Sequence, residues 1–167
     1  METTPRNVLF LCTGNSARSI MAEALLDVLG KERFHAFSAG SHPAGRVQPM
    51  AAELARQLGF TGELRSKSWD EFADPDAPRM DMIITVCDNA AGEVCPVWPG
   101  HPASAHWGVP DPAAVEGDED RRRHAYLAAW TLLRRRVELL LALPIERMEC
   151  EMFEDAVRRI GHEGVPA

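Results

Sequence analysis

The chain has 167 residues, which suits one compact domain whose core needs no disulfide bonds. Hydrophobic residues make up 46% and charged residues 26%, which excludes disordered, collagen-like and low-complexity proteins. The net charge of −7 makes nucleic acid and anionic membrane surfaces poor partners, and no run of about 18 apolar residues predicts a membrane span. Any anion that the protein binds must therefore be held by local geometry.

The number of cysteines indicates in which cellular compartment the protein occurs. Four cysteines are too few for a disulfide scaffold, and the first residues do not form a secretory signal. We therefore expect a cytoplasmic protein with reduced thiols, in which clustered cysteines are more often catalytic or metal-binding than structural.

Short apolar runs alternate with helical segments along the chain. Strands are expected at residues 7–12, 34–39, 82–87 and 105–107, and helices at 19–29, 49–58, 121–143 and 146–160. The helix at 121–143 has an apolar stripe formed by Leu127, Trp130, Leu133, Val137 and Leu141. The alternation predicts an α/β fold with a parallel sheet and helices on both faces. Ligands of such sheets bind beyond the carboxyl ends of the strands.

One long segment, residues 88–112, differs from the rest. Five prolines and two glycines lie between residues 96 and 112, and they forbid a long helix there. Loops of this length inside compact domains are usually functional.

A thiol, a run of small residues and an arginine follow the first strand. The small residues let the loop curl so that its backbone N–H groups converge on one point, beside the positive end of the next helix. Arg18 adds a planar fork for two oxygens of a tetrahedral oxyanion. These positive surroundings are expected to lower the pKa of Cys12, whose thiolate would attack the central atom of the oxyanion. The expected oxyanion-binding residues are Thr13, Gly14, Asn15, Ser16, Ala17, Arg18 and Ser19.

The stretch VLFLCTGNSARSIMAEALL is similar to the low-molecular-weight protein tyrosine phosphatase superfamily, and most of all to its arsenate reductase branch. The resemblance covers residues 6–143. It implies a three-layer α/β/α architecture with a four-stranded parallel sheet of flavodoxin-like winding. Residues 1–143 would form the catalytic core of a single domain spanning residues 1–167, and residues 144–167 a helical C-terminal extension.

A carboxylate follows the last predicted strand, at Asp111 in a loop braced by Pro110 and Pro112. Thiolate displacement needs a proton for the departing oxygen, and a carboxylic acid held near the thiol can supply it. An ordinary turn aspartate is the alternative, since Asp-Pro favours turns. The resemblance favours catalysis, because the general acid of the superfamily is an aspartate followed by proline.

Two further cysteines are expected on the same side of the sheet as Cys12: Cys87 ends the third predicted strand, and Cys95 follows in the long loop. Reduction of As(V) to As(III) consumes two electrons, which a thiol pair supplies by forming a disulfide. The resemblance implies that Cys12 attacks arsenate while Asp111 assists the loss of water. Cys87 then attacks Cys12 and releases arsenite, and Cys95 moves the disulfide outward. The implied reductant is thioredoxin, or glutathione or mycothiol with glutaredoxin, and no tightly bound cofactor is expected.

Other interpretations of the cysteines stay open. Seven residues separate Cys87 from Cys95, slightly more than in thioredoxin-coupled relatives, so a glutathione- or mycothiol-dependent variant in which Cys12 uses one partner is an alternative. An inert buried Cys87 and an arsenite-binding protein without turnover are further alternatives. A zinc site is also an alternative, formed by Cys87, Cys95, His101 and His106, although no short ligand motif matches it. No role is expected for Cys150.

The alternative function is hydrolysis of phosphotyrosine or small phosphate esters by the same loop. Phosphatases of the superfamily commonly carry paired tyrosines after the acid, whereas residues 113–115 here are Ala-Ala-Val. The single tyrosine, Tyr126, lies in a predicted helix. A phosphotyrosine ring would have less to stack on, which favours a small inorganic anion such as arsenate.

Some arsenate reductases of this type bind a potassium ion (K+), and the resemblance implies matching ligands here. Those ligands are Asn15, Glu23, Ser38 and Asp70. Oxygen ligands of this kind suit a hard cation. An exposed helix surface, a strand end and a helix N-terminus are the ordinary alternatives for the last three residues. The sequence does not indicate an oligomeric state.

Overall fold

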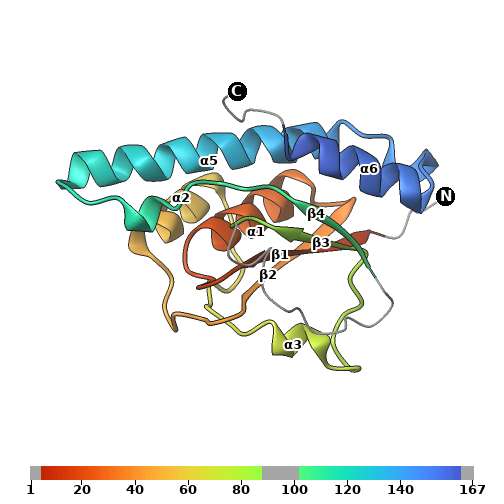
Figure 1. Ribbon diagram of the computed structural model, residues 1–167, viewed down its shortest axis with the longest axis horizontal. Helices are drawn as coiled ribbons and strands as arrows, with labels where there is room; N and C mark the ends of the chain where they lie inside the picture. Colours follow the sequence, from red (N-terminus) through yellow and green to blue (C-terminus); the bar gives the residue numbers. More distant parts are fainter. Residues whose placement is uncertain (1–4, 88–101, 163–167) are drawn as a thin grey trace.

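The computed structural model describes residues 5–87 and 102–162, and a four-stranded parallel sheet lies at its centre (Figure 1). Its strands are β1 (Arg6–Cys12), β2 (Phe34–Gly40), β3 (Met82–Thr85) and β4 (Ala103–His106). Each neighbouring pair is parallel, and the spatial order is β2-β1-β3-β4. The predicted α/β fold with a four-stranded parallel sheet is confirmed.

The strand order places a reversal of winding beside β1. From β1 the chain first adds β2 on one side and then crosses to the other side for β3. In doubly wound sheets this reversal is where ligands bind, at the carboxyl ends of the strands. Cys12 is the last residue of β1 and pairs in register with Gly40, so the predicted nucleophile lies at this position.

β1 is buried on both faces, as its continuous apolar run predicted. Val8, Phe10 and Cys12 pack into one hydrophobic cluster, and Leu9 and Leu11 pack into another on the opposite face. The strand is thereby fixed from both sides, which makes it a rigid support for the loop that follows it.

Helices cover the two faces of the sheet unequally (Figure 1). One face carries α1 (Arg18–Leu29), α2 (Pro49–Leu58), α5 (Glu119–Leu141) and α6 (Cys150–Ile160). The other carries only the short α3 (Asp70–Ala73) among the described helices, and the sequence analysis did not predict it. Two 3₁₀ turns, η1 (Pro112–Ala114) and η2 (Ile145–Arg147), complete the described elements. Within residues 5–87 and 102–162, no helix is long and apolar enough to cross a bilayer.

The long helix α5 begins earlier than predicted. The Asp118 side chain accepts a hydrogen bond from the Arg121 backbone N–H at 2.8 Å, which caps the helix. Its buried stripe includes Trp130, Leu133 and Val137 as predicted, but Leu127 is 44% exposed. The prediction for Leu127 is therefore wrong, because the helix is rotated so that Tyr126 faces the core in its place.

The last helix is tied to β4. The Trp107 indole N–H donates to the Val157 carbonyl at 2.9 Å, and the Ser104 backbone N–H donates to Glu154 at 2.9 Å. A Cβ added at Gly161 would lie 2.2 Å from the His106 carbonyl oxygen, so only glycine permits this approach. α6 thus holds the end of β4, immediately before the loop that carries Asp111.

The burial pattern of α5 predicts different costs for two leucine truncations on this helix. Leu133→Ala should lower the free energy of unfolding by about 2–5 kcal/mol, because Leu133 is fully buried. Leu127→Ala should change it by less than about 0.5 kcal/mol. Urea denaturation followed by circular dichroism measures both values, and equal losses would contradict the observed rotation of α5.

Candidate active site

The loop between β1 and α1 reverses direction at Asn15. Its φ angle of 46° is left-handed, and Asn15 is the one non-glycine residue with positive φ in the described part of the chain. The Asn15 side chain fixes this turn by donating to Ser19 Oγ at 2.8 Å and accepting from the Lys67 backbone N–H at 2.9 Å. Asn15 and Ser19 are fully buried, so the turn is held by hydrogen bonds inside the protein.

The peptide groups of this loop turn their carbonyl oxygens outward. Backbone N–H groups of residues 42–48 donate to three of these oxygens at 2.8–2.9 Å, those of Thr13, Gly14 and Ser16. Because the C=O and N–H of a trans peptide point in opposite directions, the N–H groups that follow point away from residues 42–48. The Asn15 N–H is hydrogen bonded to Cys12. With the N-terminus of α1, which has no side-chain cap, these amides form the loop of residues 13–19, called the cradle below, and its predicted role is to bind an anion.

Arg18 joins the loop to the acid-bearing segment. Its Nη1 donates to the Val109 carbonyl at 2.9 Å, and its Nη2 lies 3.6 Å from Asp111 Oδ2. Its Nε is buried and has no hydrogen-bond partner within the described residues. A buried guanidinium N–H without a partner is rare, so this atom is available to an oxygen of a bound oxyanion.

Asp111 lies at the edge of the site, and a backbone N–H two residues further along the chain holds its side chain. Its Oδ1 accepts from the Ala113 backbone N–H at 3.0 Å, which starts η1, and its side chain is 40% exposed. Arg136 of α5 is fully buried and donates to the Gly108 carbonyl at 2.9 Å. The structure thus brings Asp111 to Arg18, and the catalytic role of this carboxyl stays a prediction.

Cys87 lies directly beside Cys12. It follows β3, the strand that pairs with β1, and its buried thiol forms a hydrogen bond with the Cys12 thiol. Thr13 Oγ1 is 3.6 Å from the Cys87 sulfur. Adjacent parallel strands therefore bring two thiols together at one end of the sheet. Cys95 and His101 lie outside the described residues, so the predicted relay beyond Cys87 and the zinc alternative are not tested.

The expected lowering of the Cys12 pKa is wrong. The hydrogen bond with Cys87 and burial raise the pKa of Cys12 well above its usual range, and Arg18 and the Asn15 N–H oppose this only in part. Two thiols in contact share their protons, and the second proton is held tightly because its loss would place two thiolates side by side.

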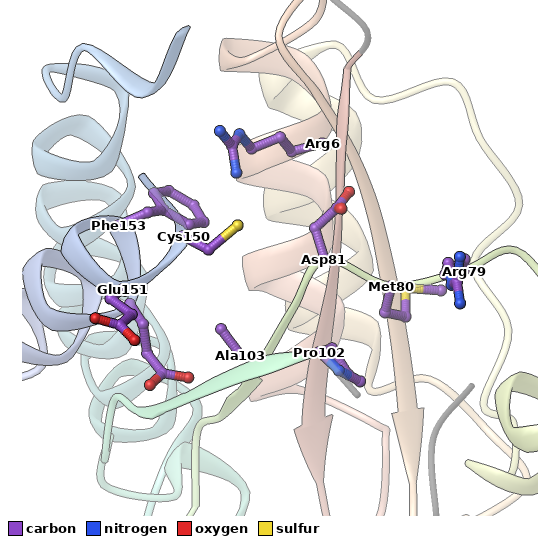
Figure 2. Close-up of a pocket in the computed structure, with 10 residues that line it drawn as sticks. Arg6, Arg79, Met80, Asp81, Pro102, Ala103, Cys150, Glu151 and Phe153 are labelled. Carbon is purple, nitrogen blue, oxygen red and sulfur yellow. The ribbon is translucent and has the colours of Figure 1, made fainter. Parts of the chain in front are cut away.

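Cys150 is at the opposite end of the sheet from Cys12. Figure 2 shows it in a cavity of about 470 Å³ whose lining also includes Arg6 and Asp81. Arg6 begins β1 and Asp81 directly precedes β3, so this cavity lies at the amino ends of the strands. Cys150 therefore serves as a control thiol that is remote from the site.

The four residues predicted to bind potassium are brought together only in part. The Ser38 hydroxyl donates a hydrogen bond to Glu23, and both lie close to the Lys67 ammonium. Asp70 begins α3 and is exposed. In the described part of the chain, no hydrogen bond or ion pair links the Asp70 side chain to the other three.

Two important residues were missed by the sequence analysis. Lys67 contacts Asn15, Ser38 and Glu23, and Arg136 anchors the segment before Asp111. Arg136 stands in a run of three arginines that resembles a solvated helix face, so no local pattern pointed to its burial. Lys67 is one of only two lysines among the 18 Lys and Arg residues, which was a weak signal.

These features define a class of protein: a doubly wound α/β domain with a thiol at the end of its first strand, followed by a tightly held loop and an arginine. The chain belongs to the low molecular weight phosphotyrosine protein phosphatase family, whose model matches residues 7–151. It is 36% identical over 118 residues to the arsenate reductase of Bacillus licheniformis, covering 70% of this chain and 81% of that protein.

Two solved structures share the fold. The arsenate reductase of Archaeoglobus fulgidus superposes with a TM-score of 0.57 at 31% identity, covering 78% of this chain and 98% of that one. A thioredoxin-dependent arsenate reductase of Corynebacterium glutamicum has a TM-score of 0.52 at 22% identity, covering 83% of this chain and 65% of that one. At that identity the second comparison supports the fold alone.

The thiol pair predicts a two-step titration. In the unaltered protein, Cys12 and Cys87 should lose their protons in two separate steps. Cys87→Ala should leave a single step for Cys12 at lower pH than the upper step of the pair, because it removes the group that raises the pKa of Cys12 most. Rates of iodoacetamide alkylation between pH 5 and 11, resolved by peptide mass spectrometry, measure this. An unchanged Cys12 profile would contradict the hydrogen bond.

Gly40 packs so closely against the cradle that a larger side chain at this position should disturb it. A Cβ at this position would lie 2.5 Å from the Thr13 carbonyl oxygen and 3.0 Å from Asn15. Gly40→Ala should therefore lower the free energy of unfolding by about 1–3 kcal/mol and weaken phosphate binding, because the loop must shift. Calorimetric titration with phosphate measures the second effect. Unchanged affinity in a folded variant would show that the cradle does not depend on this contact.

Proposed function

We propose that this protein reduces arsenate to arsenite with electrons from its own thiols. The observation that carries the proposal is the hydrogen bond between the thiols of Cys12 and Cys87. Hydrolysis of a phosphate ester by a thiolate needs a single sulfur, whereas reduction needs a second sulfur that can form a disulfide with the first. The name of the Bacillus licheniformis relative agrees with this choice.

The first proposed step is the formation of a sulfur–arsenic bond. Amides of the cradle and the Arg18 guanidinium hold the oxyanion, and Arg18 and the Asn15 N–H favour the thiolate form of Cys12. The Cys12 thiolate attacks arsenic, and one arsenic–oxygen bond breaks. The departing oxygen takes a proton from Asp111, which lies beside Arg18, and leaves as water.

The second proposed step transfers the electrons. Cys87 attacks the Cys12 sulfur as a thiolate, a disulfide forms between them, and the sulfur–arsenic bond breaks. The electron pair of that bond stays on arsenic, so As(V) becomes As(III) and two thiols are oxidised together. The contact between the two side chains means that no large movement has to precede this attack.

The last proposed step restores the active thiol. Cys95 attacks Cys87, frees Cys12 and forms a Cys87–Cys95 disulfide, which an external dithiol reduces. The proposed reductant is of the thioredoxin type, as named for the Corynebacterium glutamicum protein, and a glutathione- or mycothiol-coupled system is the alternative. Atoms and electrons balance: one arsenate and one external dithiol give one arsenite, one water and one external disulfide.

The surroundings of the acid also support a small substrate. Ala113 and Ala114 follow Asp111 in η1, and neither offers an aromatic wall. Tyr126 is only 2% exposed, and burial and the nearby Asp111 charge raise its pKa. It belongs to the core, and a phosphotyrosine ring would have little to stack on.

The proposal predicts which cysteines are essential. Cys12→Ser and Cys87→Ser should each reduce arsenate turnover to the background rate, because each removes one sulfur of the first disulfide. Cys150→Ser should retain the parental rate, because Cys150 lies at the other end of the sheet. Consumption of NADPH by a coupled thioredoxin and thioredoxin reductase system measures turnover, and peptide mass spectrometry identifies the disulfides that arsenate produces.

The same variants separate reduction from hydrolysis. A phosphatase would hydrolyse p-nitrophenyl phosphate at a rate that depends on Cys12 and not on Cys87. If Cys87→Ser reduces arsenate at the parental rate, the thiol relay is refuted. Rapid ester hydrolysis with no arsenate-induced disulfide would assign the chain to phosphate ester cleavage.

A further inference from the structure

A buried ion pair lies next to the cradle. The Glu23 carboxylate of α1 and the Lys67 ammonium are 13% and 10% exposed and 3.7 Å apart. The fully buried Ser38 hydroxyl donates to Glu23. None of the proposed chemical steps uses these groups, although the burial of two charges costs free energy.

Each donor of the Lys67 ammonium has an oxygen within reach. Its Nζ is 3.3 Å from Ser38 Oγ, 3.1 Å from the Arg65 carbonyl oxygen and 3.7 Å from Glu23 Oε1. An ammonium has three N–H donors, so this set of oxygens matches it in number. A hydroxyl, a carbonyl and a carboxylate are also the oxygen donors that hard metal cations prefer. The ammonium therefore fills a position in which a metal cation would find suitable ligands.

The two buried charges depend on each other. Burial raises the pKa of Glu23, and the Lys67 charge and the Ser38 hydrogen bond oppose this. Burial likewise lowers the pKa of Lys67, and the Glu23 charge opposes that. Removal of the ammonium would leave a desolvated carboxylate without compensation unless another cation entered.

Lys67 also holds the turn of the cradle through its backbone. Its N–H donates to Asn15 Oδ1 at 2.9 Å, and its carbonyl accepts from the Gly40 N–H at 2.9 Å. Asn15 is the residue that adopts the left-handed conformation in the loop. The residue that supplies the cation therefore also fixes the residue that turns the amides inward.

We propose that Lys67 is a built-in counter-cation for Glu23 and a positioning residue for the cradle, in place of a bound potassium ion. The four predicted ligands fit the Lys67 ammonium better than they fit a potassium ion. The ammonium already contacts Glu23 and Ser38, Asn15 Oδ1 accepts from the Lys67 N–H, and Asp70 is exposed. The inference rests on the proposed oxyanion site and adds to it the residue that holds Asn15 through its backbone and compensates the Glu23 charge through its side chain.

The choice of lysine supports this role. The chain contains only Lys31 and Lys67 among its 18 Lys and Arg residues. A compact ammonium can take the place of a spherical ion, whereas the planar guanidinium of arginine is larger and needs a fork of acceptors. The site therefore suits the compact ammonium of lysine better than the guanidinium of arginine, the more common cation in this chain.

Removal of the ammonium should make the protein dependent on potassium. Lys67→Ala and the unaltered protein are compared in KCl and in LiCl at equal ionic strength, by thermal unfolding and by calorimetric titration with phosphate. In LiCl the variant should bind phosphate about tenfold more weakly than the unaltered protein, because the uncompensated Glu23 carboxylate should displace the segment whose backbone N–H at residue 67 holds Asn15. In KCl its Tm should rise and its phosphate affinity should recover. The unaltered protein should behave alike in both salts.

Two controls separate this effect from a general salt effect and from misfolding. Lys31→Ala removes the other, exposed lysine and should not respond to the cation. The double variant Glu23→Gln with Lys67→Met removes both charges, so it should fold and be indifferent to potassium. Lys67→Ala that behaves identically in KCl and LiCl, or that stays unfolded in both, would overturn the proposal. Because no readout involves turnover, failure of arsenate reduction would leave this result unaffected.

Discussion

The structure depends on a loop whose peptide groups turn their carbonyl oxygens toward residues 42–48 and their N–H groups the other way. Such a loop persists only where the surrounding protein fixes it. Here residues 42–48 hold the outward carbonyl oxygens, and Asn15 is locked in a left-handed turn by Ser19 and Lys67. In a chain with a net charge of −7, the proposed anion binding depends on this local arrangement.

The position of the second thiol follows from the winding of the sheet. β3 pairs with β1 at the reversal of strand order, so the residues just beyond both strands face the same space. Cys87 therefore reaches Cys12 from a neighbouring rigid strand. Proximity of this kind replaces a bimolecular encounter by an intramolecular one, and in the proposed reaction it places the second sulfur beside the first when arsenic is bound there.

The sequence predicted those features that depend on local pattern. The buried strand β1 and the thiol at its end could be recognised because continuous apolar runs and small-residue loops have local signatures. The exposure of Leu127, the raised pKa of Cys12 and the contacts of Lys67 could not, because each depends on groups far away in the chain. Lys67 is separated from Glu23 by more than forty residues, and no spacing rule connects them.

A loop that takes part in a thiol relay needs support that does not come from its ligand. In the proposed cycle the Cys12 sulfur is in turn a thiolate, an arsenic adduct and one half of a disulfide, so the charge and the bonds at the centre of the cradle change repeatedly. The Lys67 ammonium stays outside these steps, because its oxygen partners belong to Glu23, Ser38 and Arg65. A covalently attached cation does not dissociate when the oxyanion leaves. The backbone N–H of the same residue holds Asn15, so the proposed counter-cation and the support of the loop remain together between one turnover and the next.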